Sequence, residues 1–196
     1  MGGAAGPGSA PAFPAAGPAA LTAAGPVRLG LIADTHGQLD ARVAAALDGL
    51  DGIVHAGDVG SGAVIAALQA VAPLTVVRGN NDVPAKWPPA DRAQLARLPA
   101  CAELDLPGGR LVIVHGDTFP AARRHGGLRA RWPTARAIVY GHSHRLTLET
   151  ETLPWIVNPG AAGRARTHGG PSWVLLEAGP GGWRLTPQRF AAATRR

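Results

Sequence analysis

Five short apolar segments, each followed directly by a cluster of polar side chains, constrain the fold of this chain more than any other feature of its sequence. The segments are rich in Val, Ile and Leu, as buried strands are. Ligands of open α/β sheets gather beyond the carboxyl ends of the strands, so we expect the polar clusters to converge. The segments are Arg28–Ala33, Gly52–Ala56, Leu74–Arg78, Arg110–Val114 and Ala137–Tyr140. The clusters are Asp34-Thr35-His36, Gly57-Asp58, Gly79-Asn80-Asn81-Asp82, His115-Gly116-Asp117 and Gly141-His142-Ser143-His144.

The composition predicts one folded domain between two tails. With 196 residues, 46% of them hydrophobic, the chain can bury a sizeable core. Residues Met1–Pro26 are mostly Gly, Ala and Pro, and they have too little bulky apolar surface to offset the entropy of ordering them. They also lack the basic region and the continuous apolar core of a signal peptide. We therefore predict a disordered tail over 1–26, a folded domain over 27–190 and a C-terminal tail over 191–196.

Cysteine content and charge narrow the class of protein. Cys101 is the only cysteine, which excludes an internal disulfide and a zinc site built from thiolates, and a cytoplasmic location fits. The net charge of +6 comes almost wholly from arginine and favours an anionic substrate, although a general preference for arginine over lysine explains it as well. The arginines are scattered, which argues against a nucleic-acid partner. No apolar stretch is long enough to span a bilayer, so we expect no membrane partner.

The first half of the folded domain alternates strands with helices. Residues Gln38–Leu50 and Ala63–Val71 carry apolar side chains at helical spacing, and each range lies between two of the apolar segments. Such alternation predicts parallel strands joined by right-handed crossovers, with helices covering the sheet.

The second half predicts hairpins instead. Turn residues separate three pairs of short apolar runs, and a segment over 120–132 favours a helix interrupted by Gly126-Gly127. We therefore expect an α/β fold in which two mixed β-sheets pack as a sandwich flanked by helices. The three pairs are Leu104–Leu106 with Arg110–Val114, Arg145–Thr150 with Leu153–Val157, and Ser172–Glu177 with Trp183–Thr186.

The Asp, His and Asn side chains at the strand ends are of the types that bind divalent metal ions. Two ions held roughly 3.5 to 4 Å apart activate a bridging water and clamp the oxygens of a phosphoester displacement. Such a site needs one carboxylate that bridges both ions, with imidazoles and oxygen donors capping each. Taken singly, each cluster also fits an ordinary turn or helix cap, and His142 with His144 also fits a single zinc ion. The five clusters together indicate a two-metal centre.

The order of these clusters resembles that of the calcineurin-like metallophosphoesterases, particularly the small bacterial and archaeal phosphodiesterase branch. That family carries Asp-x-His, Gly-Asp, Gly-Asn, a lone His and Gly-His-x-His in this order, and all five are present over about residues 27 to 190. The segment Asn158-Pro159-Gly160-Ala161 also resembles the family's Asn-Pro-Gly-Ser turn, with Ala161 in place of Ser. The resemblance implies a four-layer α-β-β-α fold and two divalent ions, with Mn favoured and Ni, Fe, Zn or Co also suitable.

The resemblance also implies a role for each ligand position. It assigns Asp34, His36 and His144 to one metal and Asn80, His115 and His142 to the other, with Asp58 bridging them. It further implies that Asp58, Asn80 and His115 belong to the catalytic machinery.

One position departs from the family pattern. Many members follow the Gly-Asn with a His that protonates the leaving group, whereas this chain has Asn81. An amide cannot act as a general acid near neutral pH. The small phosphodiesterase branch often lacks this His as well, so Asn81 points toward that branch and toward substrates with good leaving groups.

Several other polar residues are secondary candidates. We expect His55 in the core or beside the ligands, and His125 and His168 in solvent. Asp117 either orients His115 or caps the following turn. An arginine can grip a phosphate or form a structural salt bridge, and both roles stay open for Arg78, Arg145 and Arg166.

The sequence therefore predicts a divalent-metal-dependent phosphodiesterase that acts on a small phosphoester and exists as a monomer or small homo-oligomer. One alternative is a phosphomonoesterase or protein phosphatase. The other is a non-catalytic protein-interaction module of the same fold, because a retromer subunit resembles these small enzymes and fold alone does not establish turnover.

Overall fold

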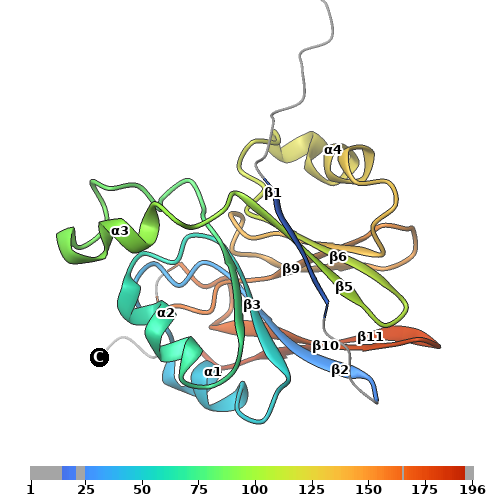
Figure 1. Ribbon diagram of the computed structural model, residues 1–196, viewed down its shortest axis with the longest axis horizontal. Helices are drawn as coiled ribbons and strands as arrows, with labels where there is room; N and C mark the ends of the chain where they lie inside the picture. Colours follow the sequence, from blue (N-terminus) through green and yellow to red (C-terminus); the bar gives the residue numbers. More distant parts are fainter. Residues whose placement is uncertain (1–14, 21–24, 165, 193–196) are drawn as a thin grey trace, which may run out of the picture.

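Two β-sheets pack face to face in the computed structural model, which describes residues 15–20, 25–164 and 166–192 (Figure 1). One sheet has six strands in the order β1-β5-β6-β7-β9-β8, and the other has five in the order β11-β10-β2-β3-β4. Both sheets contain parallel and antiparallel pairs. The predicted sandwich of two mixed sheets flanked by helices is confirmed.

The five-stranded sheet begins with the predicted alternation of strands and helices. Strands β2 (Val27–Ile32), β3 (Gly52–Ala56) and β4 (Leu74–Val77) are parallel neighbours. Between them, α1 (Ala41–Ala46) and α2 (Gly62–Gln69) pack on the face of the sheet that lies away from the other sheet. Strands β10 (Ser172–Gly179) and β11 (Gly182–Arg189) form a hairpin that extends this sheet along β2.

Helix α1 is shorter than the helix predicted over Gln38–Leu50. Its first turn begins only after Asp40, whose side chain accepts a hydrogen bond from the Arg42 N–H. The residue before that cap, Leu39, instead forms an isolated β-bridge with Gly163. The segment between β2 and α1 is therefore a loop that pairs with the loop following β9.

The six-stranded sheet contains the other two predicted hairpins. Strands β5 (Cys101–Leu106) and β6 (Gly109–Val114) form one, and β8 (Leu146–Glu149) and β9 (Trp155–Pro159) form the other. Strand β7 (Ala137–Val139) lies between β6 and β9, parallel to both.

Four short helical segments complete the domain. The 3-10 turn η1 (Pro89–Asp91) leads into α3 (Arg92–Leu95), and η2 (Ala121–Arg123) leads into α4 (Arg124–Arg131). Helix α4 runs through Gly126-Gly127, where the sequence predicts an interruption. A Cβ atom at Gly127 would lie 2.6 Å from the Phe119 ring, so close packing accounts for this glycine. None of the helices in the described part of the chain is long and apolar enough to cross a membrane.

Part of the predicted N-terminal tail is a strand. Residues Ala15–Ala20 form β1, which pairs in parallel with β5 at the edge of the six-stranded sheet (Figure 1). The prediction of disorder is wrong for these six residues, because strand pairing uses backbone groups that an edge strand leaves free and needs no bulky side chain. Residues 1–14 and 21–24, and the C-terminal residues 193–196, lie outside the described residues.

The main core lies between the two sheets. Its members include Leu31, Val54, Ile113, Val139 and Val174, each at most 1% exposed. A second apolar cluster lies beneath α1 and α2, and a third lies between the six-stranded sheet and α4. This packing fixes the strands whose carboxyl ends carry the polar clusters.

A buried carboxylate joins the loops that follow β3 and β4. Asp82, 5% exposed, accepts hydrogen bonds from the backbone N–H groups of Val59 (3.1 Å), Gly60 (2.9 Å) and Gly79 (2.8 Å). It also accepts one from Trp87 Nε1 at 2.9 Å. Replacing it would leave buried donors without partners.

We predict that Asp82→Ala lowers the free energy of unfolding by about 2 to 4 kcal/mol, because several buried N–H groups lose their acceptor. Urea denaturation followed by circular dichroism measures this change. The matched control is Asp48→Ala, an exposed carboxylate, which should change stability by less than about 0.5 kcal/mol. Equal effects of the two substitutions would contradict the role assigned to Asp82.

Candidate metal centre

The seven residues predicted as metal ligands converge at one end of the sandwich. The polar loops that follow β2, β3 and β4 of one sheet and β6 and β7 of the other meet there, as expected. Contacts between their side chains connect all seven residues. Asp34 and His36 follow β2, Asp58 follows β3, Asn80 follows β4, His115 follows β6, and His142 and His144 follow β7.

Four of these residues form one compact group. Asp34, His36, Asp58 and His144 each offer a ligand atom, and these atoms all lie within 4.8 Å of one another. His36 Nε2 lies 3.1 Å from His144 Nε2 and 3.7 Å from Asp58 Oδ2. His144 Nε2 lies 3.5 Å from Asp34 Oδ1. The group offers mixed nitrogen and oxygen ligands to a single ion.

The remaining three residues form a second group that shares Asp58. The Asn80 side-chain oxygen lies 3.1 Å from His115 Nε2 and 3.0 Å from His142 Nδ1. His115 Nε2 also lies 3.4 Å from Asp58 Oδ2, the oxygen that faces His36 in the first group. Asp58 therefore stands between the two groups.

The backbone is left-handed at most of these positions. Non-glycine residues rarely adopt positive φ, and such strain concentrates at functional sites. Here the left-handed residues lie in the turns that follow β2, β3 and β7. The residues and their φ values are Asp34 (55°), His36 (47°), Asp58 (56°), His142 (66°) and His144 (56°).

Two glycines allow the loops to approach the centre closely. A Cβ atom at Gly57, where φ is 89°, would lie 2.7 Å from His115 Nδ1. A Cβ atom at Gly79 would collide with the Asp58 carboxylate. These glycines therefore serve close packing around the ligands as well as the turns that their dipeptides suggest.

His115 is oriented by a backbone carbonyl. Its Nδ1 lies 2.9 Å from the Ala56 carbonyl oxygen and donates to it, so Nε2 is the ring nitrogen that faces Asn80 and Asp58. Asp117 is exposed, so the suggestion that it orients His115 is wrong. The Ala56 carbonyl takes the orienting role that the sequence suggested for the Asp117 carboxylate.

His55 supports the centre from the core, as expected. Its ring is fully buried, and Nε2 lies 2.9 Å from Thr35 Oγ1, which donates to the Val59 carbonyl at 2.9 Å. Burial lowers the pKa of His55 to about 4, so the ring is neutral and donates to Thr35. This chain of contacts connects the loop after β2 with the loop after β3.

His125 is not solvated as the sequence suggested. Its Nδ1 lies 2.7 Å from Glu149 Oε1, and its Nε2 lies 2.8 Å from the Tyr140 hydroxyl. The Tyr140 hydroxyl also bonds to Asn158, whose amide donates to the Gly141 carbonyl at 2.7 Å. The turn that carries His142 and His144 is thus tied to α4 and β8 through side chains.

The electrostatics favour a cation in the centre. Burial, opposed by the charge of His115 and reinforced by the charge of Asp58, raises the pKa of Asp34 to about 7. Burial alone would lower the pKa of His115, but its hydrogen bond to Asp58 and the charges of both carboxylates raise it to about 9. Burial and the adjacent His36 lower the pKa of His144 to about 4, so that ring is a neutral donor. The buried negative charge attracts protons, and a metal ion would compete with them.

The donor set fits a metal. Asp34 is 0% exposed, and within the described residues its Oδ2 atom has no hydrogen-bond partner. Buried carboxylate oxygens without partners are costly unless they coordinate a cation. The side chains of both groups also supply the nitrogen and oxygen atoms that divalent transition metals take.

Asn81 and Lys86 belong to the centre in a way that the sequence did not predict. Asn81 donates to Asp58 twice, from its backbone N–H at 2.8 Å and from its side-chain Nδ2 at 2.6 Å. Lys86 Nζ donates to the Asn81 side-chain oxygen. In the sequence, Lys86 stands out only as the single lysine of the chain, and its spacing from Asn80 matches no ligand pattern.

Of the three arginines considered, only Arg166 contacts the ligands. Its Nη2 lies 2.9 Å from His36 Nε2, and its backbone is also left-handed, with φ at 55°. Arg78 and Arg145 are exposed, and no hydrogen bond joins their side chains to the predicted ligands within the described residues. His168 is exposed, as predicted.

Known proteins are similar to this chain in sequence and in fold. A probable metallophosphoesterase from Methanothermobacter thermautotrophicus is 25% identical over 142 residues, which cover 68% of this chain and 76% of that protein. Vacuolar protein sorting 29 from Cryptosporidium parvum aligns with a TM-score of 0.65 at 19% identity, over 85% of this chain and 99% of that one. An archaeal phosphodiesterase aligns with a TM-score of 0.63 at 19% identity, over 83% and 100%.

The family assignment rests on a longer match. Residues 27–180 match the calcineurin-like phosphoesterase superfamily domain, and this range includes all five polar loops of the candidate metal centre. The protein therefore belongs to the calcineurin-like phosphoesterase superfamily.

Proposed function

We propose that this protein is a divalent-metal-dependent phosphodiesterase acting on a small phosphoester. The observation that carries the proposal is the position of Asp58, whose Oδ2 lies 3.7 Å from His36 Nε2 and 3.4 Å from His115 Nε2. One carboxylate between two sets of donors is the arrangement that a pair of ions requires.

The two groups would each hold one ion. Asp34, His36 and His144 would hold the first, and Asn80, His115 and His142 the second, with Asp58 bridging. When bound, such a pair supplies an activated water as the nucleophile and neutralises charge on the phosphoryl oxygens. Imidazole with carboxylate and amide oxygens suits Mn, which we favour, and also Fe, Co, Ni and Zn.

Asn81 supports the diester assignment. Its side-chain Nδ2 and its backbone N–H each donate one hydrogen bond to the Asp58 carboxylate, so its role is to position the bridging ligand. The place where a general acid would stand is therefore occupied by an amide that cannot donate a catalytic proton. A reaction with a good leaving group depends least on such an acid.

Lys86 partly compensates for the missing general acid at Asn81. Its ammonium contacts Asn81 and is exposed, so it can approach a leaving oxygen beside the centre. A positive charge there stabilises the alkoxide or phenoxide that develops as the bond breaks. Arg166, adjacent to His36, would orient the phosphoryl group with its guanidinium.

A non-catalytic interaction module is the second candidate, and the structural likeness to vacuolar protein sorting 29 favours it. The complete set of seven donors, one of them an unpartnered buried oxygen, supports catalysis instead. A preference for phosphomonoesters would place the protein among the phosphatases of the superfamily.

We predict that Asp58→Asn lowers kcat for bis(p-nitrophenyl) phosphate at least about 100-fold, because the bridging negative charge is lost. Steady-state assays with manganese measure activity, and plasma emission spectrometry measures bound metal. The control is Asp117→Asn, an exposed carboxylate beside His115, which should keep full activity. Activity absent from the wild type and from both variants would favour the interaction module.

We also predict that Lys86→Met slows diesters with poor leaving groups more than diesters with good ones. For phenyl esters the loss in kcat should be about 10-fold or more, and for p-nitrophenyl esters it should be severalfold smaller, since a p-nitrophenolate needs less stabilisation. Lys86→Arg, which retains the charge, is the matched control. A uniform loss across all leaving groups would show that Lys86 only supports Asn81.

A further inference from the structure

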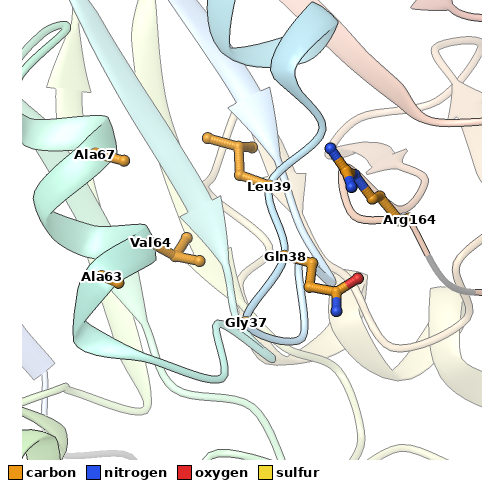
Figure 2. Close-up of a pocket in the computed structure, with 7 residues that line it drawn as sticks. All are labelled: Gly37, Gln38, Leu39, Ala63, Val64, Ala67 and Arg164. Atoms are coloured by element: carbon orange, nitrogen blue, oxygen red, sulfur yellow. The ribbon is translucent and has the colours of Figure 1, made fainter.

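A groove of about 390 Å³ adjoins the metal centre and has no part in the function proposed so far. Figure 2 shows α2 on one side of the 37–39 loop and Arg164 on the other. The Leu39 side chain extends toward α2, and the Gln38 side chain extends toward the side of Arg164 (Figure 2). The lining residues are Gly37, Gln38, Leu39, Ala63, Val64, Ala67 and Arg164.

The groove is continuous with the ligands along the chain. Gly37 directly follows His36, and its N–H donates to the Val59 carbonyl at 2.7 Å, one residue beyond Asp58. The bridge between Leu39 and Gly163 holds the loop that follows β9 beside this segment. Gly37 therefore connects the predicted ligand His36 to the lining of the groove.

The walls of the groove differ in chemistry. Leu39, Val64, Ala63 and Ala67 form an apolar side, and the small alanines keep the surface of α2 flat enough for a planar group. Gln38 forms part of a polar side with both a donor and an acceptor. Such a combination of apolar walls and a few polar groups is typical of small-molecule sites.

Arg164 adds a cation that is available to a ligand. It is exposed, and its guanidinium makes no hydrogen bond to any described residue. Asp40 acts on it electrostatically, but that carboxylate already accepts hydrogen bonds from Arg42 Nε and Nη2, each at 3.0 Å. An exposed guanidinium without a hydrogen-bond partner among the described residues can stack on an aromatic ring or donate to its polar edge.

We propose that this groove binds one ester group of the phosphodiester substrate and selects a planar, nucleoside-sized aromatic group. The ring lies against Leu39, Val64 and Ala67, and its polar atoms meet Gln38 and Arg164. This inference rests on the proposed phosphodiesterase function and assigns the class of substrate. A volume of 390 Å³ lies within the range of small-molecule sites, about 300 to 1,000 Å³.

The test compares nucleotide with phosphate binding in the manganese-loaded protein. By isothermal titration calorimetry, adenosine 5′-phosphate should bind the wild type about 10-fold or more tightly than inorganic phosphate, because the base buries apolar surface. Ala67→Trp fills the groove and should abolish this preference while leaving phosphate affinity unchanged. Arg164→Gln should weaken nucleotide binding by about threefold.

The matched control is Ala66→Trp, an exposed position on the same helix that does not line the groove, and it should keep the preference. Equal binding of nucleotide and phosphate by the wild type, or a preference that survives Ala67→Trp, overturns the proposal.

A second measurement distinguishes ligand binding in the groove from catalysis at the metal centre. Millimolar adenosine, which has no phosphate, should shift the amide NMR signals of Leu39, Ala63 and Ala67 in the wild type and leave them unshifted in Ala67→Trp. Adenosine binding without turnover of any diester would refute the phosphodiesterase function and retain the groove. Diester turnover without adenosine binding would refute the groove alone.

Discussion

The negative charge of Asp58, buried where the two groups of donors meet, is the constraint on which the rest of the centre depends. A carboxylate in this setting is stable only when hydrogen bonds and cations surround it. Asn81 supplies two donors, His115 stands 3.4 Å away, and Gly79 has no side chain because none would fit beside the carboxylate. Much of the surrounding loop structure therefore follows from accommodating one charge.

The architecture and the convergence of the ligands could be predicted from the sequence. Buried strands require continuous apolar runs, and the bounds of β3 match the predicted segment Gly52–Ala56. Parallel strands place their carboxyl ends together, so the order of the polar clusters was enough to gather seven side chains at one edge. These predictions succeeded because each depends on local pattern and on a general rule of sheet topology.

Other features depend on contacts between distant residues and left no local pattern. The pairing of His125 with Glu149 joins positions 24 residues apart, and nothing near His125 in the sequence marks it as a partner. The late start of α1, after Asp40, goes with a bridge between Leu39 and Gly163. Strand β1 forms on the edge of β5 although its own composition disfavours order.

The left-handed backbone at five of the seven predicted ligand positions has a consequence for how this fold evolves. A residue with a side chain costs about 1 to 3 kcal/mol in such a conformation, whereas glycine adopts it freely. Replacing one of these predicted ligands by glycine would therefore relieve backbone strain and at the same time remove a metal-binding side chain. Selection for stability alone would therefore favour replacement of these side chains. A chain keeps them only where their function is also under selection.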